Sequence, residues 1–199
     1  MRFIAHRINT IHELVDLPED CSVEFDIRDS AGDILVTHDP FTTGPSFSEF
    51  APHLKGRFCI VNIKSEGIEW RALKILKENG IEDFFFLDCS IPMIHKLVQS
   101  GESRIAVRFS EYEPIEYVLS WLFKVQWLWI DSFRAFKFTS YEADLLECAK
   151  MKLCIVSPEL QGRPEEIDMY VQTIQEQGLK IDAVCTKVAN FSKWSALVD

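Results

Sequence analysis

The chain has 199 residues, of which 47% are hydrophobic and 12% aromatic. This length and composition suit one globular domain with a substantial core and exclude a disordered chain. The 31 acidic and 21 basic residues give a formal net charge of -10, which argues against nonspecific binding to nucleic acid or to anionic membranes.

The sequence shows no export signal, and its longest apolar runs are shorter than the ~20 residues of a membrane span. We therefore expect a soluble, cytoplasmic protein. The six cysteines form no C-x-x-C pair, and most stand inside apolar runs. This pattern favours buried, reduced thiols over disulfides or a zinc site.

Apolar, strand-like runs alternate with helical patterns along the whole chain. Eight strands are expected, over residues 3–5, 23–27, 59–63, 84–88, 105–109, 127–131, 153–157 and 183–186. Prolines open several of the intervening helices and glycines end them. In the helix that ends at Gly80, we expect the apolar side chains to face inward: Trp70, Leu73, Ile75 and Leu76.

This alternation predicts the α/β class and a compact (β/α)8 TIM-type barrel, with residues 1–199 as a single domain. The second β/α unit is irregular, because the strand over 23–27 runs through a turn at 29–33 into another extended segment at 34–38, with no helix between them. Since ~200 residues is short for this fold, the helices must be short.

Polar and charged residues stand at the carboxyl ends of the expected strands, where the active site of such a barrel lies. On the second strand, Glu24, Asp26 and Arg28 share one face, and apolar residues alternate with them: Val23, Phe25 and Ile27. Three charges pointing into the barrel mouth require partners, a metal or a ligand.

Two histidines stand in similar places, in His6-Arg7 at the end of the first strand and in His38-Asp39 after the extended segment. Histidines transfer protons, carboxylates hold divalent cations, and arginine holds phosphate oxygens. These residue types together are those of a phosphodiesterase site.

The motifs His6-Arg7, Glu24-x-Asp26, His38-Asp39 and Asn62-x-Lys64 resemble those of the glycerophosphodiester phosphodiesterases. That family belongs to the phospholipase C-like phosphodiesterases with TIM-barrel folds, and its usual pattern is H-R-G, E-x-D, H-D and E-x-K. The motifs cover the N-terminal third of this chain, and the succession of strands extends the resemblance loosely over the rest.

The resemblance implies that His6 and His38 are the general acid and base. It implies that Glu24 and Asp26 bind a divalent cation, magnesium or calcium, and that Lys64 contacts phosphate. We expect further phosphate contacts from Arg7, Arg28 and Arg108, and further cation ligands from Asn62 and Asp131.

Two positions depart from the family pattern. Ile8 replaces the glycine after His-Arg, which changes the backbone preference of the first loop. Asn62 replaces the acidic residue of E-x-K, and an amide oxygen binds a hard cation more weakly because it brings no charge. Asp131 or Asp88 would restore the missing carboxylate from another strand.

The resemblance thus implies a hydrolase for a small soluble glycerophosphodiester-like substrate. Arg28 allows an alternative, because the segment from Phe25 to Arg28 also resembles bacterial phosphatidylinositol-specific phospholipase C, in which an arginine replaces the metal and the product is a cyclic phosphate. A noncatalytic phosphate-binding barrel is another alternative, and Lys187 is the one candidate lysine for an aldolase on the same fold.

Overall fold

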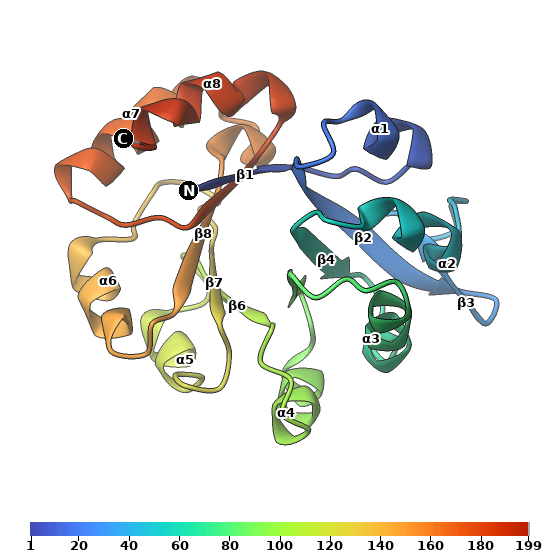
Figure 1. The fold of residues 1–199 in the computed structure, drawn as a ribbon. Coiled ribbons are helices and arrows are strands. Elements are labelled where there is room, and N and C mark those ends of the chain that lie inside the picture. The colour runs from blue at the N-terminus through green and yellow to red at the C-terminus, as the bar shows by residue number, and fades with distance from the viewer. Residues whose placement is uncertain (199) are drawn as a thin grey trace. The chain divides into compact units, whose positions relative to one another are not determined.

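The structure is a computed structural model and describes residues 1–198 (Figure 1). Its strands are β1 (Arg2–Ala5), β2 (Ser22–Ser30), β3 (Asp33–Val36), β4 (Cys59–Ile63), β5 (Phe84–Leu87), β6 (Ala106–Phe109), β7 (Trp127–Ile130), β8 (Lys152–Val156) and β9 (Ala183–Thr186). Each of the eight predicted strands is present, and β3 is the extra extended segment of the irregular second unit.

The helices are α1 (Ile11–Asp16), α2 (Phe47–Phe50), α3 (Glu69–Glu78), α4 (Ile91–Gln99), α5 (Ile115–Leu119), α6 (Ser140–Glu147), α7 (Ile167–Glu176) and α8 (Phe191–Trp194). Short 3-10 turns lie at Ala51–Leu54, Pro158–Gln161, Pro164–Glu166, Val188–Asn190 and Ser195–Leu197. The order of elements confirms the predicted α/β class and (β/α)8 TIM-type fold, with short helices.

The chain packs as two compact units. The N-terminal unit is Ala5–Glu102, and the C-terminal unit comprises Met1–Ile4 together with the chain from Ser103 onward. The single domain over residues 1–199 stays a prediction.

In the N-terminal unit the strand order is β5-β4-β2, and these three strands are parallel. The short strand β3 pairs with β2 in the antiparallel direction. On β2, Phe25 is fully buried and its ring lies 5.6 Å from that of Phe47 and 5.1 Å from that of Phe50. Glu24 and Asp26 therefore occupy the opposite face of the strand, as the alternation of β2 predicts.

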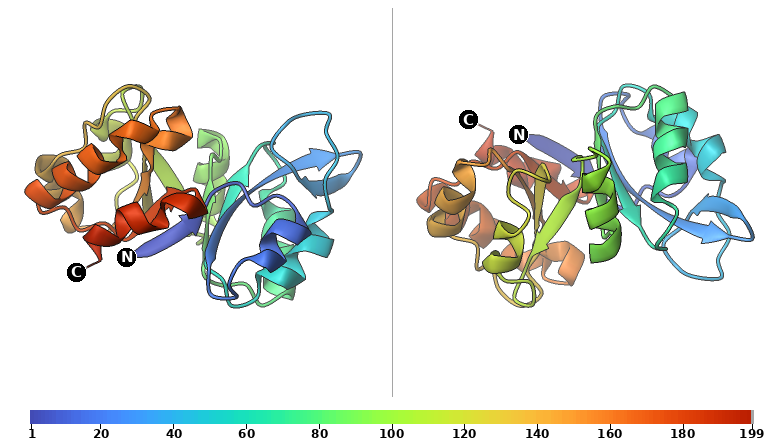
Figure 2. Two further views of the ribbon diagram at one scale, coloured as in Figure 1. Left: turned by 90° about the horizontal axis from the view of Figure 1, so that it is seen from above. Right: turned by 90° about the horizontal axis from the view of Figure 1, so that it is seen from below.

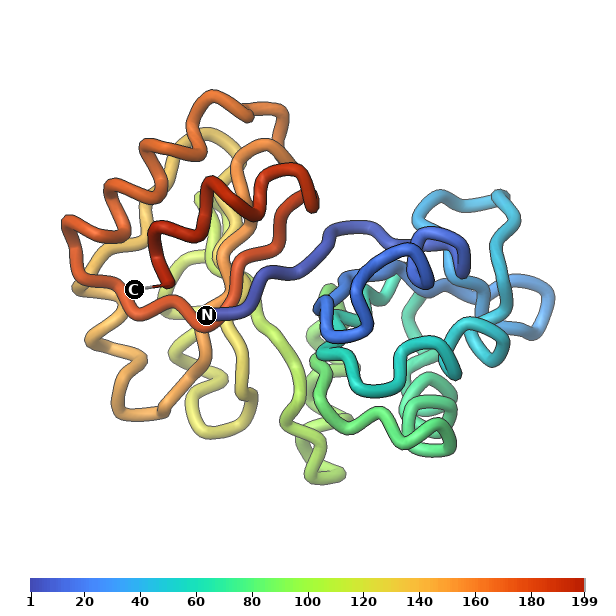
Figure 3. The backbone as a smooth tube through the Cα atoms, turned by 45° about the horizontal axis from the view of Figure 1, so that its top comes forward, coloured from blue at the N-terminus to red at the C-terminus, as the bar shows by residue number. Residues whose placement is uncertain are grey.

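In the C-terminal unit the strand order is β1-β9-β8-β7-β6. The backbone N–H of Arg2 donates to the carbonyl oxygen of Asp182 at 2.8 Å, and Figures 2 and 3 show β1 among the C-terminal segments. The core of this unit includes Tyr170 and Trp194, which are fully buried, and the Trp194 indole N–H donates to Ser157 Oγ at 3.0 Å.

The predicted inward face of α3 is wrong at Trp70, which is 45% exposed, and Leu73 is only half-buried. The buried face of this helix is Ala72, Ile75 and Leu76. Because successive helical residues are 100° apart, Trp70 lies about 200° from Ala72 and must face outward.

Within residues 1–198 no helix has the length and apolar character needed to cross a membrane. Cys59, Cys154 and Cys185 are buried, as predicted for cysteines in apolar runs, whereas Cys148 is exposed.

Candidate active site

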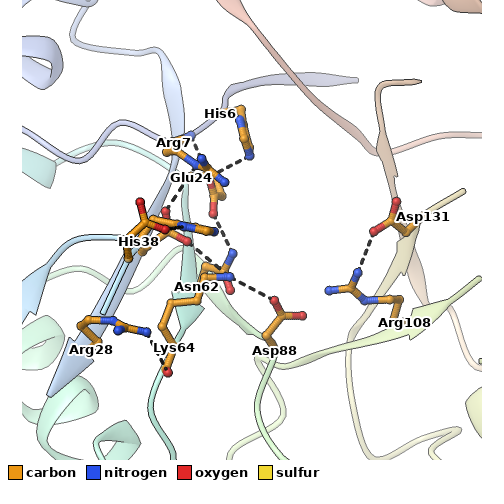
Figure 4. A network of polar contacts seen from close by, with 12 residues as sticks. His6, Arg7, Glu24, Arg28, His38, Asn62, Lys64, Asp88, Arg108 and Asp131 are labelled. Carbon is orange, nitrogen blue, oxygen red and sulfur yellow. Dashed lines mark hydrogen bonds and ion pairs between the residues drawn. The ribbon is translucent and has the colours of Figure 1, made fainter. Parts of the chain in front are cut away.

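The N-terminal unit holds most of the predicted site residues, at the end of β1, on β2 and β4 and in the segment after β3. Figure 4 shows seven of these side chains close together: His6, Arg7, Glu24, Arg28, His38, Asn62 and Lys64. Asp26 belongs to the same network through its contacts with Arg7 and Lys64.

Glu24 is a buried carboxylate of the cluster, with 1% of its surface exposed. Oε1 accepts from Asn62 Nδ2 at 3.0 Å, Oε2 accepts from the backbone N–H of Arg7 at 2.7 Å, and His6 Nε2 lies 3.8 Å from Oε2. Burial, and then the neighbouring Asp26 carboxylate, raise the pKa of Glu24 to about 7. Its ionised form therefore needs positive charge nearby.

In the loop that follows β1, the left-handed backbone conformation falls on Arg7, with φ 57°, and not on Ile8. The backbone N–H of Arg7 thereby reaches Glu24, and the N–H of Ile8 donates to the Glu24 carbonyl oxygen at 2.8 Å. The isoleucine at the family's glycine position is thus accommodated, because the strained conformation falls on its neighbour.

Asp26, also 1% exposed, is held by a residue that the sequence analysis missed. Asn9 Nδ2 donates to Asp26 Oδ2 and the Asp26 backbone N–H donates to Asn9 Oδ1, both at 2.9 Å. The signal was available, since Asn9 stands between the His6-Arg7 motif and the capping residue Thr10 of α1. A two-way contact of this kind fixes the orientation of the carboxylate.

Two buried oxygen atoms in the cluster accept no hydrogen bond from the described residues: Asp26 Oδ1 and Asn62 Oδ1. Lys64 Nζ lies 3.4 Å from Asp26 Oδ1 in an ion pair, without the geometry of a hydrogen bond. Buried polar atoms of this kind normally have partners. Both are hard oxygen donors, and the two residues face each other in register on β2 and β4.

No group of three or more His, Cys, Asp or Glu side chains in residues 1–198 is arranged to hold a metal ion. An oxygen site here would therefore rest on two carboxylates and one amide, from Glu24, Asp26 and Asn62. The donor set suits a hard divalent cation but carries less charge than a site with three carboxylates.

His38 is oriented by the next residue in the chain. Its Nδ1 lies 2.7 Å from Asp39 Oδ1, and this hydrogen bond holds the pKa of Asp39 below its usual value. A carboxylate acceptor favours the tautomer with the proton on Nδ1, which leaves Nε2 to act as a base. The sequence identified Asp39 only as part of the His-Asp motif. The structure shows that its carboxylate orients the His38 ring.

The loop that carries His38 returns to the end of β3, where its backbone packs tightly against that of Val36. Val36 N–H donates to the Pro45 carbonyl oxygen at 2.9 Å, and a Cβ atom on Gly44 would collide with the Val36 carbonyl oxygen. Since this neighbour is backbone, only a shift of the loop relieves the clash.

We expect Gly44→Ala to lower the free energy of unfolding by about 1–3 kcal/mol and to displace His38. Gly32→Ala is the control, because Gly32 has a positive φ but no atom within 4 Å of its added Cβ, so that substitution introduces backbone strain alone. Urea unfolding and the NMR signals of the His38 ring measure both effects. A Gly44→Ala protein whose His38 signals are unchanged would contradict the expected displacement.

Lys64 and Arg28 supply positive charge on the β4 side of the cluster. Lys64 Nζ lies 3.3 Å from Asp88 Oδ2, so Asp88 pairs with the lysine. Arg28 Nη2 donates to the Lys64 carbonyl oxygen at 3.4 Å, and within the described chain the buried Arg28 Nε has no hydrogen-bond partner. Arg28 thus keeps a buried donor that a ligand oxygen would satisfy.

Arg108 and Asp131 lie in the C-terminal unit, on and just after its strands β6 and β7. Arg108 Nη1 donates to Asp131 Oδ2 at 2.6 Å, and Asp131 Oδ1 accepts from Gln161 Nε2 and from the Ser132 backbone N–H, each at 2.9 Å. Both oxygens of Asp131 therefore accept hydrogen bonds within its own unit, whereas Asp26 Oδ1 accepts none from the described residues.

The site in the N-terminal unit combines two histidines beside carboxylates with three long cationic side chains and two buried oxygens that accept no hydrogen bond from the described residues. Such a site suits an anionic ligand that reacts by proton transfer.

Two solved structures share this fold over nearly the whole chain. One is an Agrobacterium tumefaciens protein assigned as a glycerophosphoryl diester phosphodiesterase, with a TM-score of 0.71, 12% identity and coverage of 100% of this chain and 99% of the other. The second is a glycerophosphodiester phosphodiesterase from Agrobacterium tumefaciens, with a TM-score of 0.65, 13% identity and coverage of 93% and 96%. At this identity, the similarity confirms the resemblance at the level of the fold.

No protein-family model matches the chain, and no curated protein sequence matches it.

Proposed function

We propose that this chain cleaves a small soluble phosphodiester of the glycerophosphodiester type, with His6 and His38 as general acid and base and with help from a divalent cation, magnesium or calcium. One observation carries the proposal: the two histidines, each beside a carboxylate, border a cluster that combines cationic side chains with two buried oxygens, of Asp26 and Asn62, that accept no hydrogen bond from the described residues. The names of the two structures that share the fold support the same reaction class.

The surroundings of the two histidines favour different roles. His38 is hydrogen-bonded to Asp39 through Nδ1, and its Nε2 is suited to remove a proton from the attacking oxygen. His6 Nε2 lies 3.8 Å from Glu24 Oε2, so a protonated His6 ring would have a carboxylate beside it. His6 is therefore suited to protonate the leaving alcohol.

Three cationic side chains are suited to hold the phosphate oxygens. Arg7 is 49% exposed at the edge of the cluster, whereas Lys64 is 19% exposed and lies deeper. Arg28 has an unused buried donor. Positive charge aimed at the phosphate stabilises the charge that develops as the ester bond breaks.

Glu24, Asp26 and Asn62 are the residues that would hold the cation. Asp26 Oδ1 and Asn62 Oδ1, which accept no hydrogen bond from the described residues, support this donor set, and both atoms are of the type that magnesium and calcium prefer. A bound divalent cation would supply positive charge to the phosphate oxygens.

The test is turnover of a panel of phosphodiesters, followed by phosphorus NMR, with added magnesium or calcium and again with chelator. Metal-dependent formation of a phosphomonoester is the expected result. Phosphate binding without turnover of any diester, by folded protein, would favour the noncatalytic barrel instead.

A second candidate, a cation-independent enzyme that forms a cyclic phosphate, is favoured by one observation. Arg28 Nε is buried without a partner, and Lys64 already supplies an ammonium group beside Asp26. Turnover that survives chelation and yields a cyclic phosphate would select this candidate.

The expected partner is the small-molecule substrate. The absence of nucleic-acid and membrane partners, and the cytoplasmic location, stay predictions from the sequence.

A further inference from the structure

The ammonium group of Lys64 lies between two carboxylates that come from different segments. Nζ is 3.4 Å from Asp26 Oδ1 and 3.3 Å from Asp88 Oδ2, and the second contact is also a hydrogen bond. Asp26 is almost fully buried, whereas the Asp88 side chain is 29% exposed. The lysine thus has a buried partner and a more accessible one.

The buried contact uses the same oxygen that a divalent cation would need. Asp26 Oδ2 already accepts from Asn9 at 2.9 Å, which leaves Oδ1 as the oxygen of Asp26 that is available to a new ligand. Two positive charges a few ångströms apart repel each other, and the repulsion is stronger where they are partly buried. The ammonium and the cation therefore compete for Asp26 Oδ1.

We propose that Lys64 is a built-in competitor of the cation at Asp26, and that Asp88 is a positioning residue that retains Lys64 when the cation displaces it. This inference rests on the proposed function, because it concerns the same donor set. In the absence of the cation, Lys64 neutralises Asp26; when the cation binds, Lys64 gives up Asp26 and keeps its contact with Asp88.

The backbone around Asp88 favours this change of partner by Lys64, from Asp26 to Asp88. Asp88 follows directly after β5, and β5 pairs with β4 in a register that sets Leu87 beside Asn62. Asp88 has φ 59°, a left-handed conformation that aspartate and asparagine adopt more readily than most residues. Its carboxylate already contacts Nζ, so the lysine loses one partner and needs no new one.

The test is a titration of the full chain with magnesium and with calcium, measured by calorimetry, for the wild type, Lys64→Met, Asp88→Asn and the double variant. Methionine keeps the apolar stem of lysine, and asparagine keeps the left-handed backbone. We expect Lys64→Met to bind the cation about tenfold more tightly or better, because it removes the competitor.

We expect Asp88→Asn alone to weaken cation binding. Of the two carboxylates that contact Lys64, only that of Asp26 is then left, so the lysine competes more strongly with the cation. In the Lys64→Met background the same substitution should have a clearly smaller effect, and the difference measures the coupling of the two side chains. Lys74→Met is the control for loss of a lysine charge, since Lys74 is 74% exposed on α3 and should leave the affinity unchanged.

Unchanged or weaker cation binding by Lys64→Met would overturn the competition. Equal effects of Asp88→Asn in both backgrounds would overturn the role of Asp88. If no variant binds a cation but the wild type still cleaves diesters, the inference fails while the diesterase reaction stands. If cations bind as expected but no diester is cleaved, the proposed reaction fails and the inference stands.

Discussion

Replacing His6 or His38 by alanine should slow diester turnover by about 10²–10⁴-fold in each case, because each histidine carries one proton transfer. Both side chains border the cluster, and each is held near a carboxylate, His6 at 3.8 Å from Glu24 and His38 at 2.7 Å from Asp39. The measurement is kcat on the best diester of the panel, with circular dichroism to establish that each variant is folded.

His12→Ala is the matched control. His12 is 86% exposed on α1 and pairs with Asp16 at 3.0 Å, so its loss should leave turnover unchanged. If folded His6→Ala and His38→Ala proteins are as active as this control, the acid–base assignment is wrong.

A substrate with a good leaving group separates the two roles. The nitrophenolate of an activated nitrophenyl diester leaves as a stable anion without being protonated, so a variant that lacks the general acid loses little of its rate on this substrate. We expect this recovery for His6→Ala and not for His38→Ala. The reverse pattern would exchange the two roles and leave the proposed reaction in place.

The strands and the charged face of β2 were predictable, because alternation with period two is a local property of the sequence. Glu24 and Asp26 are each 1% exposed and lie opposite the buried Phe25, as that alternation requires. The same local reasoning failed at Trp70, since the face that a helix buries depends on what packs against it and not only on which of its residues are apolar.

The partners of Glu24 and Lys64 were not predictable, because these contacts join residues that are distant in sequence. Asn62 and Glu24 are 38 positions apart, and Lys64 and Asp88 are 24 apart. A motif identifies which residue types are present, but it does not show that Lys64 is shared between Asp26 and Asp88. Nor does it show that the left-handed conformation falls on Arg7 and not on Ile8.

The second large effect is expected when the amide of Asn62 is replaced by a carboxylate. Asn62 Nδ2 donates to Glu24 Oε1 at 3.0 Å, and both side chains are buried, with 8% and 1% exposed. In Asn62→Asp this hydrogen bond is replaced by two facing carboxylates. In chelator we expect the free energy of unfolding to fall by about 1–3 kcal/mol or more, since a buried acceptor loses its donor and gains a like charge.

Magnesium or calcium should reverse this loss, because Asn62→Asp adds a third carboxylate to the proposed donor set and should tighten cation binding by at least about tenfold. Thermal unfolding with and without each cation, together with calorimetric titration, measures both effects. Asn79→Asp is the control, because Asn79 Nδ2 donates to the Ile75 carbonyl oxygen at 2.9 Å and lies outside the site. Its stability should not respond to the cation. If cations fail to restore Asn62→Asp, the cation is not held at this position, and Arg28 and Lys64 are left as the charges that face the phosphate.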